Sequence, residues 1–133
     1  MTPLAIGIYN YFKAAPANTF YTAMGGRMYF GEAPQGATFP YCVMSIISSE
    51  HDWTFTDEME SVLVQFSIFT NESSAVNIGL HWGKLKALHD DASLTISGYA
   101  QLSLLRGQSI LLRETENNIW QYAVEYECML EVS

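Results

Sequence analysis

The stretch IWQYAVEYECMLEV, residues 119–132, decides the fold class, because apolar and polar side chains alternate along it. One face would carry Trp120, Tyr122, Val124, Tyr126, Cys128, Leu130 and Val132. The other would carry Gln121, Glu125, Glu127 and Glu131, with Ala123 and Met129 between them. A period of two is that of a β-strand with one covered face, so the sequence predicts a long strand here.

The same alternation appears in VLVQFSI, residues 62–68, which predicts a second strand with one face toward a core. Val62, Val64, Phe66 and Ile68 would face that core, and Leu63, Gln65 and Ser67 would face away. The apolar and β-branched run at 41–49 predicts a buried strand. Short strands are expected over 27–30 and 94–96, and a longer one over 100–113, which Gly107 can interrupt.

Helix signals lie near the N-terminus and in the middle of the chain. Thr2-Pro3 begins the first helix, which ends near Ala15 because Pro16 cannot continue it. A short helical turn is expected at 19–24, before two glycines. The second main helix starts from a cap within 71–74 and runs to about His89. Its apolar stripe is Ile78, Trp82, Leu85 and Leu88.

Together these elements predict an α+β fold. We expect an antiparallel β-sheet of four or more strands, with two main helices packed on one face. The chain has 133 residues and contains no repeat or linker, so residues 1–133 are expected to form a single domain.

The composition limits the partners that this domain can have. Hydrophobic residues make up 49% and charged residues only 15%, which is little charge to cover a small monomer. Acidic residues outnumber basic ones by 14 to 6, so we expect DNA to be repelled rather than bound. No secretory signal is expected at the N-terminus. No apolar run reaches the roughly 18 residues of a membrane span.

No catalytic, cofactor or metal site is predicted. The turn GEAPQG, residues 31–36, lacks a lysine and precedes a strand, so it is a connector rather than a phosphate loop. His51, His81 and His89 do not have the spacing of metal ligands and are expected to be solvated or hydrogen-bonded. Cys42 and Cys128 are expected as buried free thiols, with a disulfide between neighbouring strands as the alternative.

The connection HDWTFTDE, residues 51–58, is a candidate contact site, expected within a long, projecting hairpin connection from 49 to 61. Trp53 and Phe55 stand among charged and polar residues, where a loop is normally polar. Either both rings fold back onto the domain, or they anchor a partner together with Asp57 and Glu58. The glutamates of 119–132 would make one sheet face acidic, and in a closed ring that face would form an acidic wall.

Two segments carry a resemblance to a known family: GRMYFGEAPQGATFPYCVMSII (26–47) and VLVQFSIFTNESSAVNIGLHWGKLKALHD (62–90). The chain resembles the tail-completion proteins of long-tailed bacteriophages, also called tail-terminator or head–tail joining proteins. Gly26–Tyr29, Ala33-Pro34 and Pro40-Tyr41 match the first half of the family pattern. The strand that runs into a helix after a polar break at Thr70–Ser74 matches the second.

The resemblance implies a structural protein without enzymatic activity or cofactor. Such a protein assembles as a hexameric ring that caps the head-proximal end of the tail tube. Its partners would be copies of itself, the major tail tube protein and the head connector or stopper protein. DNA would pass through the lumen without specific binding, and no membrane is involved. The expected location is the virion, and the host cytoplasm during assembly.

Two alternatives remain open at this point. One is a head-side connector or another minor tail protein with a similar small fold. The other is a small ligand-binding or enzymatic α+β domain, whose pocket would lie between the helices and the sheet.

Overall fold

The computed structural model describes residues 2–14, 19–53, 58–72, 75–90, 92–114 and 118–132. For residues 51–53 it describes the backbone only. Within these ranges the chain forms three helices and five strands. In order they are α1 (Thr2–Ala14), α2 (Thr19–Ala23), β1 (Met28–Phe30), β2 (Tyr41–Trp53), β3 (Glu58–Thr70), α3 (Val76–His89), β4 (Tyr99–Glu114) and β5 (Ile119–Val132).

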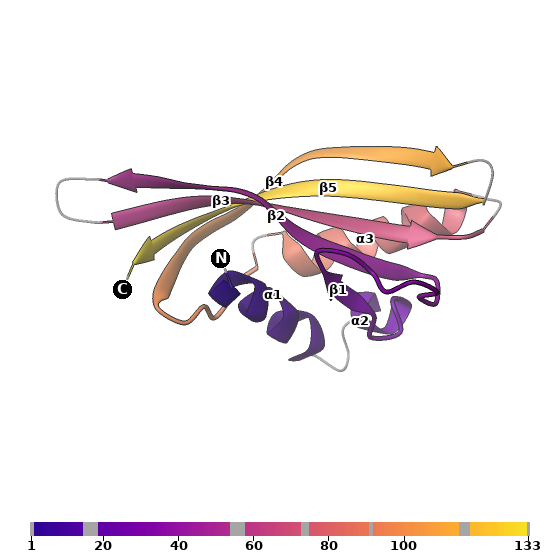
Figure 1. Ribbon diagram of the computed structural model, residues 1–133, viewed down its shortest axis with the longest axis horizontal. Coiled ribbons are helices and arrows are strands. Elements are labelled where there is room, and N and C mark those ends of the chain that lie inside the picture. The colour runs from indigo at the N-terminus through magenta and orange to yellow at the C-terminus, as the bar shows by residue number, and fades with distance from the viewer. Residues whose placement is uncertain are drawn as a thin grey trace.

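The strands form one sheet in the order β1-β2-β3-β5-β4, and the helices lie on one side of it (Figure 1). The predicted α+β class is confirmed. One detail differs, because β1 pairs with β2 in parallel, whereas the other three pairings are antiparallel. The 31–40 connector returns the chain so that both strands run the same way, and Arg27 Nε donates to Pro40 O at 3.1 Å across it. A three-residue strand carries no pattern that reveals its direction.

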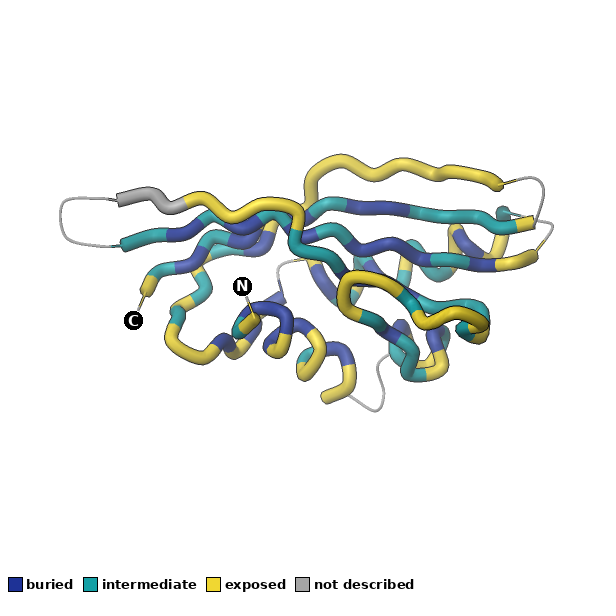
Figure 2. Tube along the Cα trace, in the orientation of Figure 1, coloured by how far each residue is buried: buried dark blue, intermediate teal, exposed yellow. Residues whose placement is uncertain are grey.

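The core lies between β2, β3 and β5 and the helices. The sheet contributes Cys42 and Met44 of β2, Val62, Val64, Phe66 and Ile68 of β3, and Val124, Tyr126, Cys128 and Leu130 of β5. The helices contribute Leu4, Ile8, Phe12, Phe20, Ile78 and Leu85. Figure 2 shows this burial alternating along the central strands. The alternation predicted for β3 and β5 is therefore confirmed, since helices cover only one face of the sheet.

The predicted connection between 49 and 61 is shorter than expected. Strand β2 continues to Trp53, and β3 starts at Glu58, with Trp53 paired to Glu58 in the register. Most of the segment is therefore a two-stranded ribbon, whose end projects past the helix layer (Figure 1). Polar side chains do not stop a ladder of backbone hydrogen bonds, so the strands extend beyond the covered core.

The prediction of a strand at 94–96 is wrong. This segment contains only an isolated bridge between Ile96 and Tyr99. Its backbone is satisfied by a side chain: Leu94 N donates to Gln101 Oε1 at 2.6 Å, and Gln101 Nε2 donates to Ala92 O at 2.7 Å. Alternate residues are still buried, which explains why the sequence resembles a strand.

This segment packs closely against α1, which leads to a prediction at Gly7. A Cβ at Gly7 would lie 2.7 Å from Thr95 O, whereas one at Gly83 of α3 meets nothing within 4 Å. Gly83→Ala should stabilise the fold by about 0.5–1 kcal/mol through helix propensity. Gly7→Ala should instead destabilise it by about 1 kcal/mol or more, because the clash outweighs the same gain. Urea unfolding measures both, and an equal gain at the two positions would contradict the packing of α1 on Thr95.

Candidate assembly surfaces

Potential metal ligands are scattered over the described part of the chain. No group of three or more histidine, cysteine or carboxylate side chains in those ranges is placed to hold a metal ion. His81 and His89 lie on α3, two turns apart, and the side chain of His51 is outside the description. Among the described segments, no helix has the length and apolar character needed to span a membrane.

His89 is the most buried of the polar side chains. Its Nδ1 donates to Leu85 O at 3.1 Å, while its Nε2 has no hydrogen-bond partner among the described residues. The rings of Phe66, Phe20 and Tyr126 surround it, with the Phe66 centroid 4.3 Å away. Burial lowers the pKa of His89 to about 4, so the ring is neutral at pH 7. This histidine is a structural part of the core.

A polar contact near His89 fixes the middle of β4. The Tyr126 hydroxyl donates to Asp90 Oδ1 at 2.7 Å, and Arg106 Nε lies 3.5 Å from the same oxygen. Burial and this hydrogen bond raise the pKa of the Tyr126 hydroxyl, which therefore stays protonated. The contact joins the end of α3 to β5 and β4 at Arg106.

Cys42 and Cys128 are both free and buried, which confirms the expectation of buried free thiols over that of a disulfide. Burial raises the pKa of each thiol, that of Cys128 to about 12, so neither is a reactive thiolate at neutral pH.

Of the four predicted contact residues, Trp53 ends β2 and Glu58 begins β3. Phe55 and Asp57 are outside the described residues, as is the side chain of Trp53. Glu58 is half-buried at the start of β3. The role of these four residues as partner contacts therefore stays a prediction.

The sheet face opposite the helices is acidic. Glu125, Glu127 and Glu131 of β5 alternate with the buried residues and so project from this face, here called the open face. Ser61 Oγ donates to Glu127 Oε1 at 3.2 Å across the strands. Glu50 of β2 pairs with Ser61 and lies on the same face.

The basic side chains are kept away from this open face. Arg106 and Arg113 point to the helix side of β4, where their guanidinium groups lie 5.7 Å from the Trp82 ring and 4.5 Å from the Trp120 ring. The others are Lys13 at the end of α1, Lys84 and Lys86 on α3, and Arg27, which binds carbonyls of the 31–40 connector. Charge is thus separated between the two sides of the sheet.

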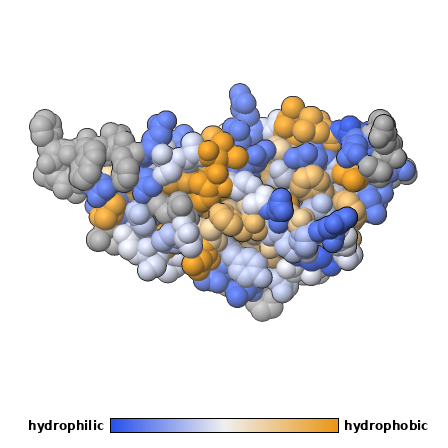
Figure 3. Space-filling model, in the orientation of Figure 1, coloured by the Kyte–Doolittle hydropathy of each residue, from blue (hydrophilic) through white to orange (hydrophobic). Residues whose placement is uncertain are grey.

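The second half of β4 is an exposed apolar edge, which we call the β4 strip (residues 105–114). Every residue in it is exposed, as the upper right strand in Figure 2 shows. Leu105 is 57% exposed and Ile110 55%, and Leu111 and Leu112 are also exposed. Figure 3 shows hydrophobic side chains at the surface in this region.

The β4 strip was not anticipated as a surface feature. The sequence shows a signal for it, because apolar residues are adjacent at Leu104-Leu105 and at Ile110-Leu111-Leu112 instead of alternating. Adjacent apolar residues in a strand place hydrophobic side chains on both faces. In this edge strand residues 105–114 are all exposed, so both faces meet solvent.

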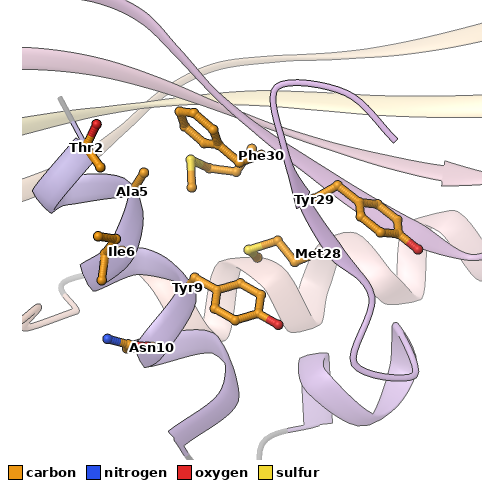
Figure 4. A pocket seen from close by; sticks show the side chains of 9 residues that line it. Thr2, Ala5, Ile6, Tyr9, Asn10, Met28, Tyr29 and Phe30 are labelled. Atoms are coloured by element: carbon orange, nitrogen blue, oxygen red, sulfur yellow. The ribbon is translucent and has the colours of Figure 1, made fainter. Parts of the chain in front are cut away.

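A second apolar surface lies between α1 and β1, and we call it the α1–β1 groove (Figure 4). Its volume is about 410 Å³. It is lined by Thr2, Ala5, Ile6, Tyr9, Asn10, Met28, Tyr29, Phe30 and Met44. Ile6 is 56% exposed and Phe30 59%, on opposite walls. None of the lining residues is charged, so this groove is a hydrophobic surface rather than a reactive site.

Comparison with known proteins gives a match at the level of the fold. No protein-family model matches the chain, and no curated protein sequence matches it. Among solved structures, a chain in the virion of a native gene transfer agent particle has a similar fold, with a TM-score of 0.79. The similarity covers 96% of this chain and 94% of that chain, at 13% sequence identity. The two chains therefore share their architecture over nearly their whole lengths.

Proposed function

We propose that this protein is a structural virion protein that caps the head-proximal end of a phage tail tube as a hexameric ring. The observation that carries the proposal is the similarity in fold, over 96% of the chain, to a component of a gene transfer agent virion. The resemblance of 26–47 and 62–90 to the tail-completion pattern supports the same class. The ring would end tube polymerisation and present a surface to the head connector.

The charge distribution supports a ring through which DNA passes. We propose that the open face of the sheet, with Glu125, Glu127 and Glu131, faces the lumen. A lumen lined by carboxylates repels the phosphate backbone and so does not retain DNA during transit. The basic residues would then lie in the subunit body or on its outer side.

The mechanism would be surface complementarity rather than chemistry. Each copy contacts its neighbours in the ring, and the ring contacts the tail tube on one side and the connector on the other. The β2–β3 ribbon projects from the subunit body and is suited to reach a neighbouring copy or the tube (Figure 1). We assign the contact to Trp53, Phe55, Asp57 and Glu58 at its end, where aromatic residues would act as anchors.

The alternative of a ligand-binding or enzymatic domain would place its ligand in the α1–β1 groove. A specific ligand site needs a few convergent polar groups in an apolar pocket. Here the polar side chains are those of Thr2, Tyr9, Asn10 and Tyr29, and none is charged. A saturable small-molecule site on a stable monomer would overturn the proposed function.

The first test is the oligomeric state of the purified protein. Native mass spectrometry should find a species of six 14.9 kDa chains, and electron microscopy should show rings with a central pore. A chain that stays monomeric at high concentration would contradict the proposal. A head-side connector can also form rings, so assembly in the absence of the protein separates the two roles. Tubes longer than normal indicate a terminator, and tails of normal length without heads indicate a head-side part.

The contact role of the ribbon is tested by Trp53→Ala. Truncating an interface anchor costs about 2 kcal/mol or more, so we expect at least a tenfold weaker contact and few head-joined tails of normal length. Leu80→Ala is the control, because Leu80 of α3 is 58% exposed and lies outside the ribbon, the β4 strip and the α1–β1 groove. Leu80→Ala should leave assembly intact. Normal tails with Trp53→Ala would remove the ribbon from the interface.

A further inference from the structure

We propose that the ring closes head to tail, with the β4 strip of each copy lying along the β1 edge of the next copy and filling its α1–β1 groove. This inference rests on the proposed function only in assuming a ring. It assigns the two surfaces that meet, and it identifies the occupant of the groove as a second copy of this chain.

The first observation is that the β4 strip carries exposed apolar side chains, and that none of the described residues covers them. It pairs on one side with β5, and its other edge has no partner strand among the described residues. Leu111 points to the helix side, since it pairs with Tyr122, and Ile110 and Leu112 point to the open side. An apolar edge strand of this length normally aggregates unless a partner covers it.

The second observation is that the opposite edge of the sheet is formed by β1 and has an apolar groove beside it. Strand β1 is only three residues long and pairs on one side, with β2. Beside it, the α1–β1 groove is hollow and apolar, with Ile6 and Phe30 exposed on its two walls (Figure 4). An incoming strand would add to the edge and place alternate side chains in the groove, as in β-strand addition.

The positions of the two surfaces determine the type of interface. The order β1-β2-β3-β5-β4 places them at the two ends of the same sheet, so one copy cannot fill its own groove. Pairing of β4 with β4 would give an isolated two-fold dimer and leave both grooves empty. Pairing of β4 with the β1 edge uses both surfaces of every copy, and this head-to-tail arrangement is the one that generates rings.

Charge agrees with such a contact. A strand of ten residues extends about 33 Å, which is longer than the three-residue β1, so most of the strip would lie along the groove and its rims rather than pair with β1. The groove has no charged lining residue. Arg106, at the start of the strip, already lies beside Asp90 in its own subunit. The strip also carries Arg113, whose Nη2 donates to Asn118 Oδ1 at 2.9 Å, so the contact buries apolar surface beside arginines that already have partners in their own subunit.

Thiol cross-linking between two variants that each carry one added cysteine tests the inference directly. Leu111→Cys places a thiol on the β4 strip, and Phe30→Cys places one in the groove. Both positions are exposed, and the native Cys42 and Cys128 are fully buried and should not react. With a short bis-maleimide, a mixture of the two variants should give a cross-linked dimer, and neither variant alone should do so. A chain with both substitutions should give a ladder of products up to the full ring.

The outcomes separate this inference from the proposed function. Rings seen by electron microscopy with cross-linking of Leu111→Cys to itself would overturn the head-to-tail contact but keep the ring. Rings with no cross-link in any combination would overturn the assigned surfaces. A monomer under all conditions, with no cross-link, would overturn both the ring and this contact.

A charge placed in the strip gives an independent test. Leu111→Asp should raise the concentration needed for ring assembly at least tenfold, while thermal unfolding of the monomer stays close to that of the unmodified chain. Leu80→Asp is the matched control, because Leu80 of α3 is 58% exposed and lies outside both surfaces. Equal effects of the two substitutions on assembly would contradict the assignment of the β4 strip.

Discussion

Replacing Phe66 with alanine should destabilise the folded monomer by about 3–5 kcal/mol, the usual cost of truncating a buried aromatic ring. Phe66 is 1% exposed at the centre of β3, and its ring contacts both His89 and Tyr126, at centroid distances of 4.3 and 5.7 Å. The cavity would open where α3 meets β3 and β5. Because domains of this size are stable by only about 5–15 kcal/mol, the variant should be close to unfolding at 37 °C.

The measurement is urea unfolding at protein concentrations low enough to keep the chain monomeric, since assembly adds apparent stability. Phe30→Ala provides the control, because it removes the same ring from an exposed position. We expect Phe30→Ala to change the stability of the monomer by about 0.5 kcal/mol or less, and to act on assembly instead. Similar unfolding midpoints for the two variants would contradict the assignment of Phe66 to the core.

Acidification should destabilise the fold through His89, by about 2 kcal/mol between pH 7 and pH 5. The pKa of His89 is lowered to about 4 by burial, from an ordinary value of 6.5. Below pH 6.5 the unfolded chain binds a proton that the folded chain excludes, so the free energy of unfolding falls with pH. The loss from this group continues to about pH 4 and then stops, because both states are protonated.

The variant His89→Leu isolates this contribution, because it removes the titrating ring and keeps an apolar side chain in the core. His81 also has a lowered pKa through burial, and it remains in the variant, so the difference between the two chains belongs to His89. The free energy of unfolding, measured by urea at pH 7 and at pH 5, should fall by about 2 kcal/mol less in the variant. Identical pH dependence would contradict a buried neutral His89.

The fold class could be predicted because its central strands have one covered and one open face. In 62–68 and 119–132, the position of each side chain relative to the helix layer decides whether it is apolar, so the sequence carries the period of the strand. The direction of β1 and the absence of a strand at 94–96 could not be predicted in this way. The parallel pairing of β1 depends on the path of the 31–40 connector, which no period records. The 94–96 segment alternates like a strand, yet the Gln101 side chain, and not a partner strand, hydrogen-bonds the backbone of Ala92 and Leu94.

The candidate surfaces were harder to predict, because apolar residues that bind a partner cannot be told from apolar core residues by sequence alone. Leu105, Ile110 and Leu111 are of the residue types that fill a core, and only their exposure in the fold shows that none of the described residues covers them. The acidic face of β5 was recognised from the alternation of its glutamates. The separation of the basic residues from that face needed the register of β4, where Arg113 lies over Trp120.

The irregularity in β4 between Arg106 and Ser109 has a consequence for how the chain tolerates changes of length. The register shift adds one residue, so that Leu111 and Arg113 face the helix side and Ile110 and Leu112 face the open side. Deleting the exposed Gln108 would remove this extra residue while Ser109 still pairs with Val124, so both sets would keep their faces and only the bulge would be lost. A bulge also increases local twist, which sets the direction in which the strand end points. In the proposed ring, head-to-tail contacts would close at one angle and grow into open helical filaments at others, so loss of the bulge would favour fibres over rings.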